Sequence, residues 1–239
     1  MMEKPWKNSK EYYDLQAVDI YSNPDTNFYH RGFIGNNDEE FIDYLIQESG
    51  VDSNSKVLDM GCGSGYFVNE LSKFCKSKGI TNSPVNLKYC QSTYPNSSYE
   101  LANMETYKTN NITHCFALES FNYTHYKTTF KNVYNMLTDN GIFFLKEWNG
   151  LEVENNKAKQ NRIYWEKFWC YKAPKTSKII SIAEECGFEL ISNKSLEGKF
   201  NKYLYKGTFQ YHHDYVKNFS VPYPGEKYTI PVQLKFQKI

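Results

Sequence analysis

The sequence predicts an α/β fold, a Rossmann-like, doubly wound and mostly parallel seven-stranded sheet with helices on both faces. Two observations lead to this fold class. Short apolar runs that end in turn residues alternate with segments in which apolar residues recur every three to four positions, the pattern of strands that alternate with helices. The first of these runs, residues 56–60, leads directly into a glycine-rich turn, as at the start of many doubly wound sheets.

The individual elements are expected from local signals. Residues 38–49 carry apolar side chains at helical spacing after a capping Asn or Asp and before Gly50, so they predict a helix. Pro84 marks the start of another helix, and the turn Asp139-Asn140-Gly141 follows the end of a third. The expected helices are residues 38–49, 67–74, 84–93, 124–137 and 176–186, and the expected strands are residues 56–60, 79–81, 98–102, 113–118, 142–145, 187–191 and 231–236.

A chain of 239 residues is expected to form a single domain. Residues 1–37 are polar and aromatic without a sustained period, which predicts an N-terminal arm or lid with one short helix. Residues 38–149 contain the alternating pattern and are expected to form the core. Residues 150–175 and 199–227 are aromatic-rich insertions after the fifth and sixth strands, and they are expected to build a ligand pocket.

Composition argues against several classes of protein. The chain has 28 Lys and Arg against 27 Asp and Glu, a net charge of +1, and no run of like charges that is typical of nucleic-acid binding. The 6 cysteines form no Cys-x-x-Cys pair, so no zinc or other metal site is predicted. Without an apolar leader or a stretch of about 20 apolar residues, we expect a cytoplasmic protein with no membrane span.

The strongest signal is the turn at residues 59–65, which reads Asp-Met-Gly-Cys-Gly-Ser-Gly. Glycines allow a tight turn and the close approach of a ligand, and the following helix aims its N-terminal amides into the crevice at the strand ends. Asp59 is expected at the end of the strand, where its carboxylate can bind an amino group or, alternatively, cap the helix. The candidate cofactor-binding residues of this turn are Asp59, Gly61, Cys62, Gly63 and Gly65.

Together with Val57 and Leu58, this turn resembles motif I of the class I S-adenosylmethionine-dependent methyltransferases, which reads hydrophobic-hydrophobic-acidic-x-Gly-x-Gly-x-Gly. It differs from the dinucleotide fingerprint Gly-x-Gly-x-x-Gly in the spacing of its third glycine and in the acidic residue ahead of the first, which suits a cofactor without a pyrophosphate. The resemblance covers roughly residues 35–148. It implies S-adenosylmethionine as the cofactor and leaves nicotinamide cofactors as the minor alternative.

The segment at the end of the second strand indicates a smaller group of methyltransferases within this class. Many methyltransferases of this class have a carboxylate there that holds the ribose hydroxyls, whereas residues 79–86 read Gly-Ile-Thr-Asn-Ser-Pro-Val-Asn. This segment resembles the Gly-hydrophobic-Thr-x-Ser-x-x-Gln pattern of the cyclopropane-fatty-acid synthase and mycolic-acid group and of geranyl diphosphate C-methyltransferases. The resemblance implies that Thr81 and Asn86 lie on the ribose side of the cofactor. Asn82 is a further cofactor-binding candidate of this segment. The alternative for Thr81 and Asn86 is a helix cap and a surface polar residue.

Two further segments follow the third and fourth strands. By the same resemblance, Asn103 and Met104 lie beside the adenine, where Asn103 can accept a hydrogen bond from its amino group and Met104 can pack on the ring. The segment 118–123 resembles the Glu-Ser segment of small-molecule methyltransferases, so Glu119 is expected to face both cofactor and substrate. Glu119 and Tyr123 are the catalytic candidates, Glu119 as a general base or as the partner of a developing positive charge. Alternatively, Glu119 only orders its loop.

The leading functional hypothesis is methyl transfer to a small-molecule acceptor, at carbon or at an amine nitrogen, by in-line displacement. Methyl transfer to RNA or protein is the second hypothesis, and the even charge and the absence of a tetrapeptide such as Asn-Pro-Pro-Tyr after the fourth strand disfavour it. A third hypothesis is a cofactor-binding regulatory protein without catalysis, against which the intact motif I argues. The sequence leaves the acceptor and the oligomeric state open.

Overall fold

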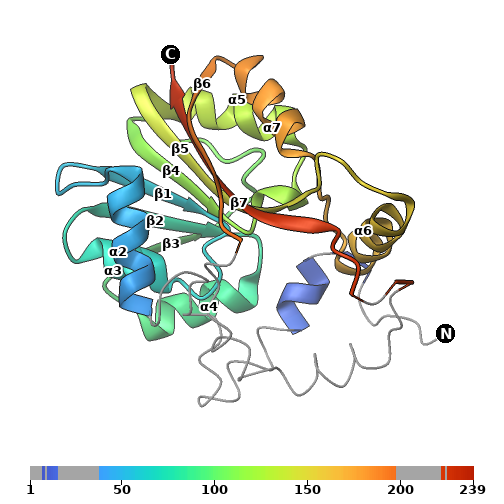
Figure 1. The fold of residues 1–239 in the computed structure, drawn as a ribbon. Coiled ribbons are helices and arrows are strands. Elements are labelled where there is room, and N and C mark those ends of the chain that lie inside the picture. The colour runs from blue at the N-terminus through green and yellow to red at the C-terminus, as the bar shows by residue number, and fades with distance from the viewer. Residues whose placement is uncertain (1–6, 9, 16–37, 198–221, 224) are drawn as a thin grey trace.

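The computed structural model describes residues 7–8, 10–15, 38–197, 222–223 and 225–239. Strands in these residues form one sheet in the order β3-β2-β1-β4-β5-β7-β6 (Figure 1). Strands β1 to β5 pair in parallel, whereas β7 runs antiparallel to both β5 and β6. The strands are β1 (Lys56–Met60), β2 (Lys76–Thr81), β3 (Ser98–Leu101), β4 (Ile112–Leu118), β5 (Leu137–Gly150), β6 (Phe188–Ser195) and β7 (Thr229–Lys238). The predicted fold class, a mostly parallel seven-stranded sheet, is confirmed.

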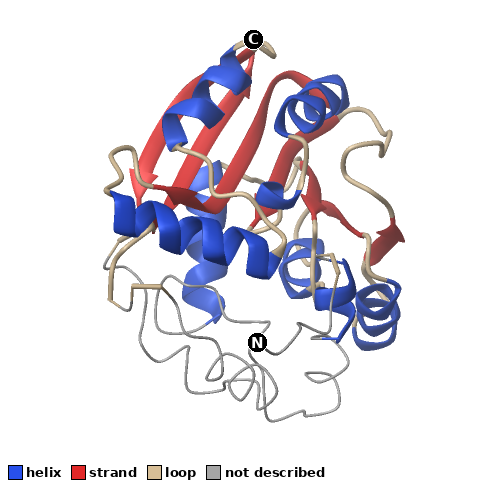
Figure 2. Ribbon diagram, turned by 90° about the vertical axis from the view of Figure 1, so that its right-hand side faces the viewer, coloured by secondary structure: helices blue, strands red, loops and turns tan. Residues whose placement is uncertain are grey.

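Helices pack on both faces of the sheet (Figure 2). Neighbouring residues of β1 show this, because Val57 packs with α2 and α3 whereas Leu58 packs with α5 and α7. Such burial on both faces explains why the strands read as continuous apolar runs. The helices are α2 (Asp38–Ser49), α3 (Tyr66–Ser72), α4 (Pro84–Thr93), α5 (Tyr126–Met136), α6 (Asn156–Trp169) and α7 (Thr176–Glu184), with a 3-10 turn η2 (Phe121–Tyr123) and a short helix at residues 10–15.

The strand order indicates which end of the sheet binds ligands. From β1 the chain proceeds to β2 and β3 on one side, then crosses to β4 and β5 on the other side of β1. In an open sheet of this kind, ligands bind outside the carboxyl ends of the strands at the point where the order reverses. The segments that follow β1, β2, β4 and β5 therefore meet at one end of the sheet.

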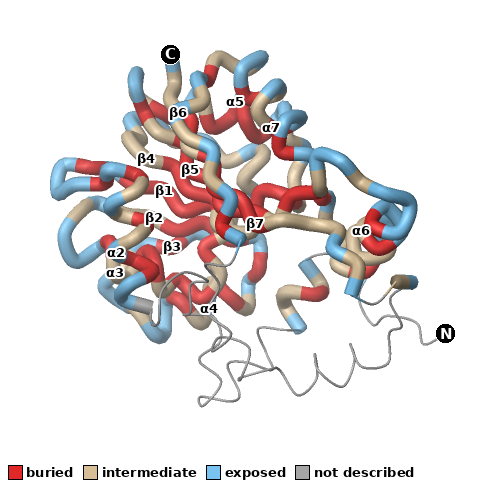
Figure 3. Tube along the Cα trace, in the orientation of Figure 1, coloured by how far each residue is buried: buried red, intermediate tan, exposed pale blue. Residues whose placement is uncertain are grey.

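Burial identifies the same end in another way. The middle of β5 is apolar, with Phe143 and Phe144 fully buried, as expected for a strand covered on both faces (Figure 3). Toward its carboxyl end, however, Lys146, Glu147 and Asn149 are also buried, with at most 5% of each residue exposed. Because buried charges are costly unless they are paired, this end of β5 needs partners from neighbouring segments.

Residues 150–175 contain an element that the sequence did not predict. Helix α6 begins after Asn155, whose side chain accepts a hydrogen bond from the Ala158 amide at 2.9 Å. Its apolar residues do not follow one face, because Ile163 is 49% exposed while Ala158 and Phe168 are buried, so the helical period is weak. Most of the predicted arm at residues 1–37 and of the insertion at residues 199–227 lies outside the described residues.

Phe130 of α5 is expected to be a main stabilising residue of the core. It is fully buried, and its ring centroid lies 4.9 to 5.7 Å from those of Phe121, Phe143, Phe188 and Phe236. Phe130→Ala should lower the free energy of unfolding by about 3–5 kcal/mol through lost burial and a residual cavity. Urea unfolding measures this, with the exposed Ile163→Ala as a control that is expected to change stability by less than about 0.5 kcal/mol.

Candidate active site

The glycine-rich turn after β1 is held by the backbone of β2. The amides of Gly61 and Cys62 both donate to the carbonyl of Ile80, at 2.8 and 3.0 Å, and the amide of Gly65 donates to the carbonyl of Cys62 at 2.8 Å. All three glycines of the turn adopt positive φ, with values of 84° at Gly61, 52° at Gly63 and 82° at Gly65. Glycine is therefore required at these positions by backbone conformation.

Two of the glycines are also required by close packing. A Cβ on Gly61 would lie 2.4 Å from Cβ of Ser120, and one on Gly65 would lie 2.6 Å from the ring of Tyr99. Hydrogen bonds hold both contacts, because Ser120 Oγ donates to the Met60 carbonyl at 2.5 Å and the Tyr99 hydroxyl donates to the Gly65 carbonyl at 2.8 Å. The turn is thus positioned against the segment that follows β4.

Asp59 is a buried carboxylate with an unsatisfied oxygen atom. It is 3% exposed, and its Oδ1 atom has no hydrogen-bond partner among the described residues. Burial raises the pKa of this carboxyl group to about 7, since desolvation disfavours the charged form. An amino group bound at this position would supply both the missing hydrogen bond and a compensating charge, so the residues present fit the amino acid part of S-adenosylmethionine.

At the end of β2, the polar residues divide into buried and exposed. Thr81 and Asn86 are buried, at 4% exposure each, whereas Asn82 is exposed. The cap of α4 is Ser83, whose Oγ accepts from the Asn86 amide at 3.1 Å. Thr81 is therefore not the helix cap and Asn86 is not a surface residue, so neither has the alternative role that the sequence left open. The Ser83 amide in turn donates to Oγ1 of Thr81 at 3.2 Å.

After β3, Asn103 and Met104 have separate roles. The Asn103 side chain accepts from the Glu105 amide at 2.8 Å and so orders a turn, although a carbonyl oxygen can accept a second hydrogen bond. The Cε atom of Met104 would lie 3.4 Å from a Cβ on Gly61. Met104 thus lies beside the glycine-rich turn, and its packing on an adenine ring stays a prediction.

Glu119 follows β4 in a strained backbone conformation. Its φ is 58°, in the left-handed region, and its amide donates to the Lys146 carbonyl at 2.7 Å. Its carboxylate forms an ion pair with the ammonium of Lys146, whose side chain is only 4% exposed while that of Glu119 is 30% exposed. Non-glycine residues in such conformations concentrate at functional sites. Glu119 therefore has a structural contact through Lys146 and an accessible carboxylate at the same time.

Lys146 and Glu147 were missed by the sequence analysis. Glu147 is 5% exposed, and its Oε1 atom accepts a hydrogen bond from the Phe121 amide at 2.6 Å. Burial raises its pKa to about 8, and the charge of Glu119 acts in the same direction. The only signal in the sequence was a Lys-Glu pair directly after an apolar run in a strand expected to be buried. Glu147 thus supports the η2 turn that carries Tyr123.

Tyr123 lies in an aromatic cluster. Its hydroxyl accepts a hydrogen bond from that of Tyr13 at 2.7 Å, and its ring centroid lies 6.0 Å from that of Tyr171. Burial raises the pKa of Tyr123 well above its usual value, so the phenol stays protonated at neutral pH. Residues from the short helix and from α6 complete the surroundings, namely Tyr12, Trp165, Phe168 and Trp169.

Three histidines are further titratable candidates in the sequence, His125, His212 and His213. His125 caps α5, because its Nδ1 atom accepts from the Thr128 amide, whereas His212 and His213 lie outside the described residues. In the part of the chain that the structure describes, no group of three or more His, Cys, Asp or Glu residues could hold a metal ion. Among the described helices, none is both long and apolar enough to cross a membrane.

The sequence matches a known family over most of its length. A model of the family described as "Mycolic acid cyclopropane synthetase" matches residues 33–223, and the chain belongs to this family. Among curated proteins, protein 235L of Invertebrate iridescent virus 6, named as a methyltransferase, is 24% identical over 186 residues, which are 72% of this chain and 65% of that protein. The tRNA N(3)-methylcytidine methyltransferase trm140 of Schizosaccharomyces pombe is 22% identical over 160 residues, 59% of this chain and 51% of that protein. The chain thus spans between half and two thirds of these relatives.

Solved structures share the fold at low sequence identity. Geranyl diphosphate C-methyltransferase from Streptomyces coelicolor, in complex with Mg²⁺, geranyl diphosphate and S-adenosyl-L-homocysteine, has a TM-score of 0.71 at 10% identity, covering 99% of this chain and all of that one. Haemonchus contortus phosphoethanolamine N-methyltransferase 2 has a TM-score of 0.74 at 13% identity, covering 98% of this chain and 61% of that one. With the family match, these neighbours place the chain among the class I methyltransferases, whose cofactor is S-adenosylmethionine.

Asp59→Asn is expected to stabilise the protein while weakening cofactor binding. Between pH 3.8 and about 7 the folded Asp59 binds its proton more tightly than the unfolded one, so Asp59 lowers stability increasingly as the pH rises through this window. The substitution should therefore raise the free energy of unfolding little at pH 4 and by up to roughly 4 kcal/mol at pH 8. Urea unfolding at both pH values tests the sign.

Calorimetric binding of S-adenosylhomocysteine to the same variant tests the role of Asp59, with NADH as the control ligand. A loss of at least about tenfold in affinity is expected, because the substitution removes the negative charge that strengthens the hydrogen bond to the amino group. Equal affinity of the wild type and Asp59→Asn would show that Asp59 does not hold the amino group.

Proposed function

We propose that this protein transfers a methyl group from S-adenosylmethionine to a small-molecule acceptor, at carbon or at an amine nitrogen. The observation that carries the proposal is the arrangement at the carboxyl ends of β1 and β4. There, Asp59, whose buried Oδ1 atom has no hydrogen-bond partner in the described part of the chain, precedes the glycine-rich turn, and that turn packs directly on Ser120, the residue after Glu119. The contact between the glycine-rich turn and Ser120 thus places the proposed cofactor site next to the carboxylate of Glu119, which we assign to the acceptor.

The chemistry requires little from the protein beyond alignment. The methyl group of S-adenosylmethionine is already electrophilic because a sulfonium carries it, so an acceptor atom must be held in line and water excluded. On the cofactor side we assign Asp59 and the turn at residues 61–65 to the amino acid part. We assign Thr81, Asn82 and Asn86 to the ribose, and Asn103 with Met104 to the adenine.

On the acceptor side we assign Glu119 and Tyr123. The accessible carboxylate of Glu119 accepts the proton that an amine loses, or balances the positive charge that develops on methylation at carbon. Lys146 holds this carboxylate in place through the ion pair. The protonated phenol of Tyr123 and the rings around it exclude water and stabilise positive charge through their faces.

The solved neighbours are consistent with a small acceptor of either kind. One is named for C-methylation of geranyl diphosphate, and the other for N-methylation of phosphoethanolamine. The curated relative named as a tRNA methyltransferase supports the RNA alternative only weakly, because the identity is 22% and the net charge of this chain is +1. Binding to RNA with a steep dependence on salt would reverse this preference.

The class of acceptor can be tested with a panel of prenyl diphosphates, amines and phenols. Each compound is incubated with the protein and S-adenosylmethionine, and formation of S-adenosylhomocysteine is measured. We expect turnover with one of these classes and none with tRNA. Methylation of tRNA alone, or binding of S-adenosylhomocysteine without turnover on any substrate, would favour the RNA and the regulatory hypotheses, respectively.

Glu119→Gln tests the catalytic assignment. The amide keeps the shape of the side chain but neither accepts a proton nor carries a charge, so methyl transfer should fall by about a hundredfold or more while S-adenosylhomocysteine still binds. Glu185→Gln is the matched control, because Glu185 forms an exposed ion pair with Lys127 away from the site. Unchanged transfer in Glu119→Gln would show that Glu119 only orders its loop.

A further inference from the structure

The short helix at residues 10–15 lies across the functional end of the sheet. Figure 1 shows it between α4 and α6. Toward α6, the ring of Tyr12 packs edge-on against Trp169 with centroids 5.0 Å apart, and the Tyr13 hydroxyl donates to that of Tyr123 at 2.7 Å. Toward α4, Ser83 Oγ donates a hydrogen bond to Asp14. The helix therefore brings a carboxylate from the start of the chain to the end of β2.

The carboxylate of Asp14 lies at the end of β2, where the neighbouring sequence contains no acidic residue. The segment from Thr81 to Asn86 contains only neutral residues, and the hydroxyl of Thr81 already accepts from the Ser83 amide. A ribose presents two hydroxyl donors, and a carboxylate is the strongest acceptor that a protein offers them. The end of β2 thus lacks such an acceptor in its own sequence but receives one from Asp14.

The carboxylate of Asp14 has capacity for a ligand. Its Oδ1 atom accepts from Ser83, and its Oδ2 atom accepts from the ammonium of Lys10 at 2.6 Å. Each carboxylate oxygen can accept two hydrogen bonds, and the Asp14 side chain is 23% exposed. Lys10 is on the solvent side, with 48% of its side chain exposed, so this ion pair leaves the remaining lone pairs accessible.

We propose that Asp14 is a cofactor-binding residue that accepts a hydrogen bond from a ribose hydroxyl of S-adenosylmethionine. The inference depends on the cofactor of the family and not on the acceptor proposed above. It can therefore fail while methyl transfer stands, and it is tested by binding without turnover. The competing explanation is that Asp14 only docks the helix through Ser83.

The test measures binding of S-adenosylhomocysteine and its 2′-deoxy and 3′-deoxy counterparts to the full chain by calorimetry. The wild type should bind at least one deoxy compound about tenfold to a hundredfold more weakly than S-adenosylhomocysteine, the usual loss for a hydrogen bond to a charged group. Asp14→Asn should bind S-adenosylhomocysteine more weakly by a similar factor and should lose most of its preference over that deoxy compound. A merely structural role of Asp14 would not change this preference.

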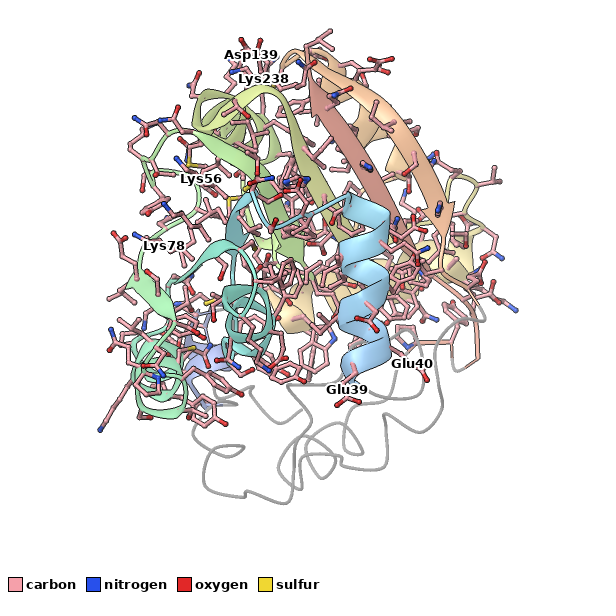
Figure 4. All side chains as sticks on the ribbon, turned by 90° about the vertical axis from the view of Figure 1, so that its left-hand side faces the viewer. Glu39, Glu40, Lys56, Lys78, Asp139 and Lys238 are labelled. Atoms are coloured by element: carbon pink, nitrogen blue, oxygen red, sulfur yellow. The ribbon has the colours of Figure 1, made fainter. Side chains whose placement is uncertain are left out.

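Two controls separate the ribose contact from docking of the helix. Tyr13→Phe removes a docking hydrogen bond but keeps Asp14, so the preference over the deoxy compound should remain. Asp139→Asn makes the same chemical change at the opposite end of the sheet, where Asp139 lies beside Lys238 and its side chain is 97% exposed (Figure 4), and should match the wild type. The proposal is wrong if Asp14→Asn retains the wild-type preference, if the wild type shows none, or if S-adenosylhomocysteine does not bind.

Discussion

The functional end of this protein depends on the close approach of two backbone segments, the turn after β1 and the segment after β4. Gly61 leaves no space for a side chain against Ser120, and Ser120 donates a hydrogen bond back to Met60. Because this contact fixes the glycine-rich turn relative to Glu119, it fixes the proposed cofactor half of the site relative to the proposed acceptor half. In-line transfer depends on such alignment, and a misplacement of about 1 Å can be costly.

Buried charge at the carboxyl end of β5 is the second constraint. Lys146 and Glu147 are adjacent in one strand, so their side chains point to opposite faces of the sheet. Lys146 pairs with Glu119, while Glu147 receives the Phe121 amide from the η2 turn. The segment after β4 thus supplies a countercharge for Lys146 and a hydrogen bond for the carboxyl group of Glu147. The same contacts that offset the cost of burial position Glu119 and Tyr123, so stability and function depend on one another here.

The sequence predicted candidate site residues where a short motif of neighbouring residues defines them. The glycine-rich turn, Thr81 and the Glu119 segment could be identified because neighbouring residues define each of them, and alternating apolar patterns predicted the sheet. Lys146 could not be recognised, since its partner Glu119 lies in the segment after β4, 27 residues away in the sequence. Helix α6 was missed because the exposed Ile163 lies off the buried face that contains Ala158 and Phe168, which weakens the helical period. The roles of Asp59 and Glu119 in binding and catalysis stay predictions until they are measured.

The position of Asp14 also depends on contacts between segments that are distant in the sequence. A helix at residues 10–15 is too short to be stable alone, since isolated helices below about 12 residues are marginal in water. Its position must come from its contacts with Ser83, Tyr123 and Trp169, which belong to three different segments. Ser83 lies in the proposed cofactor half of the site, and Tyr123 lies in the proposed acceptor half. One short helix therefore touches both the segment after β2 and the segment after β4, a placement that local sequence patterns do not predict.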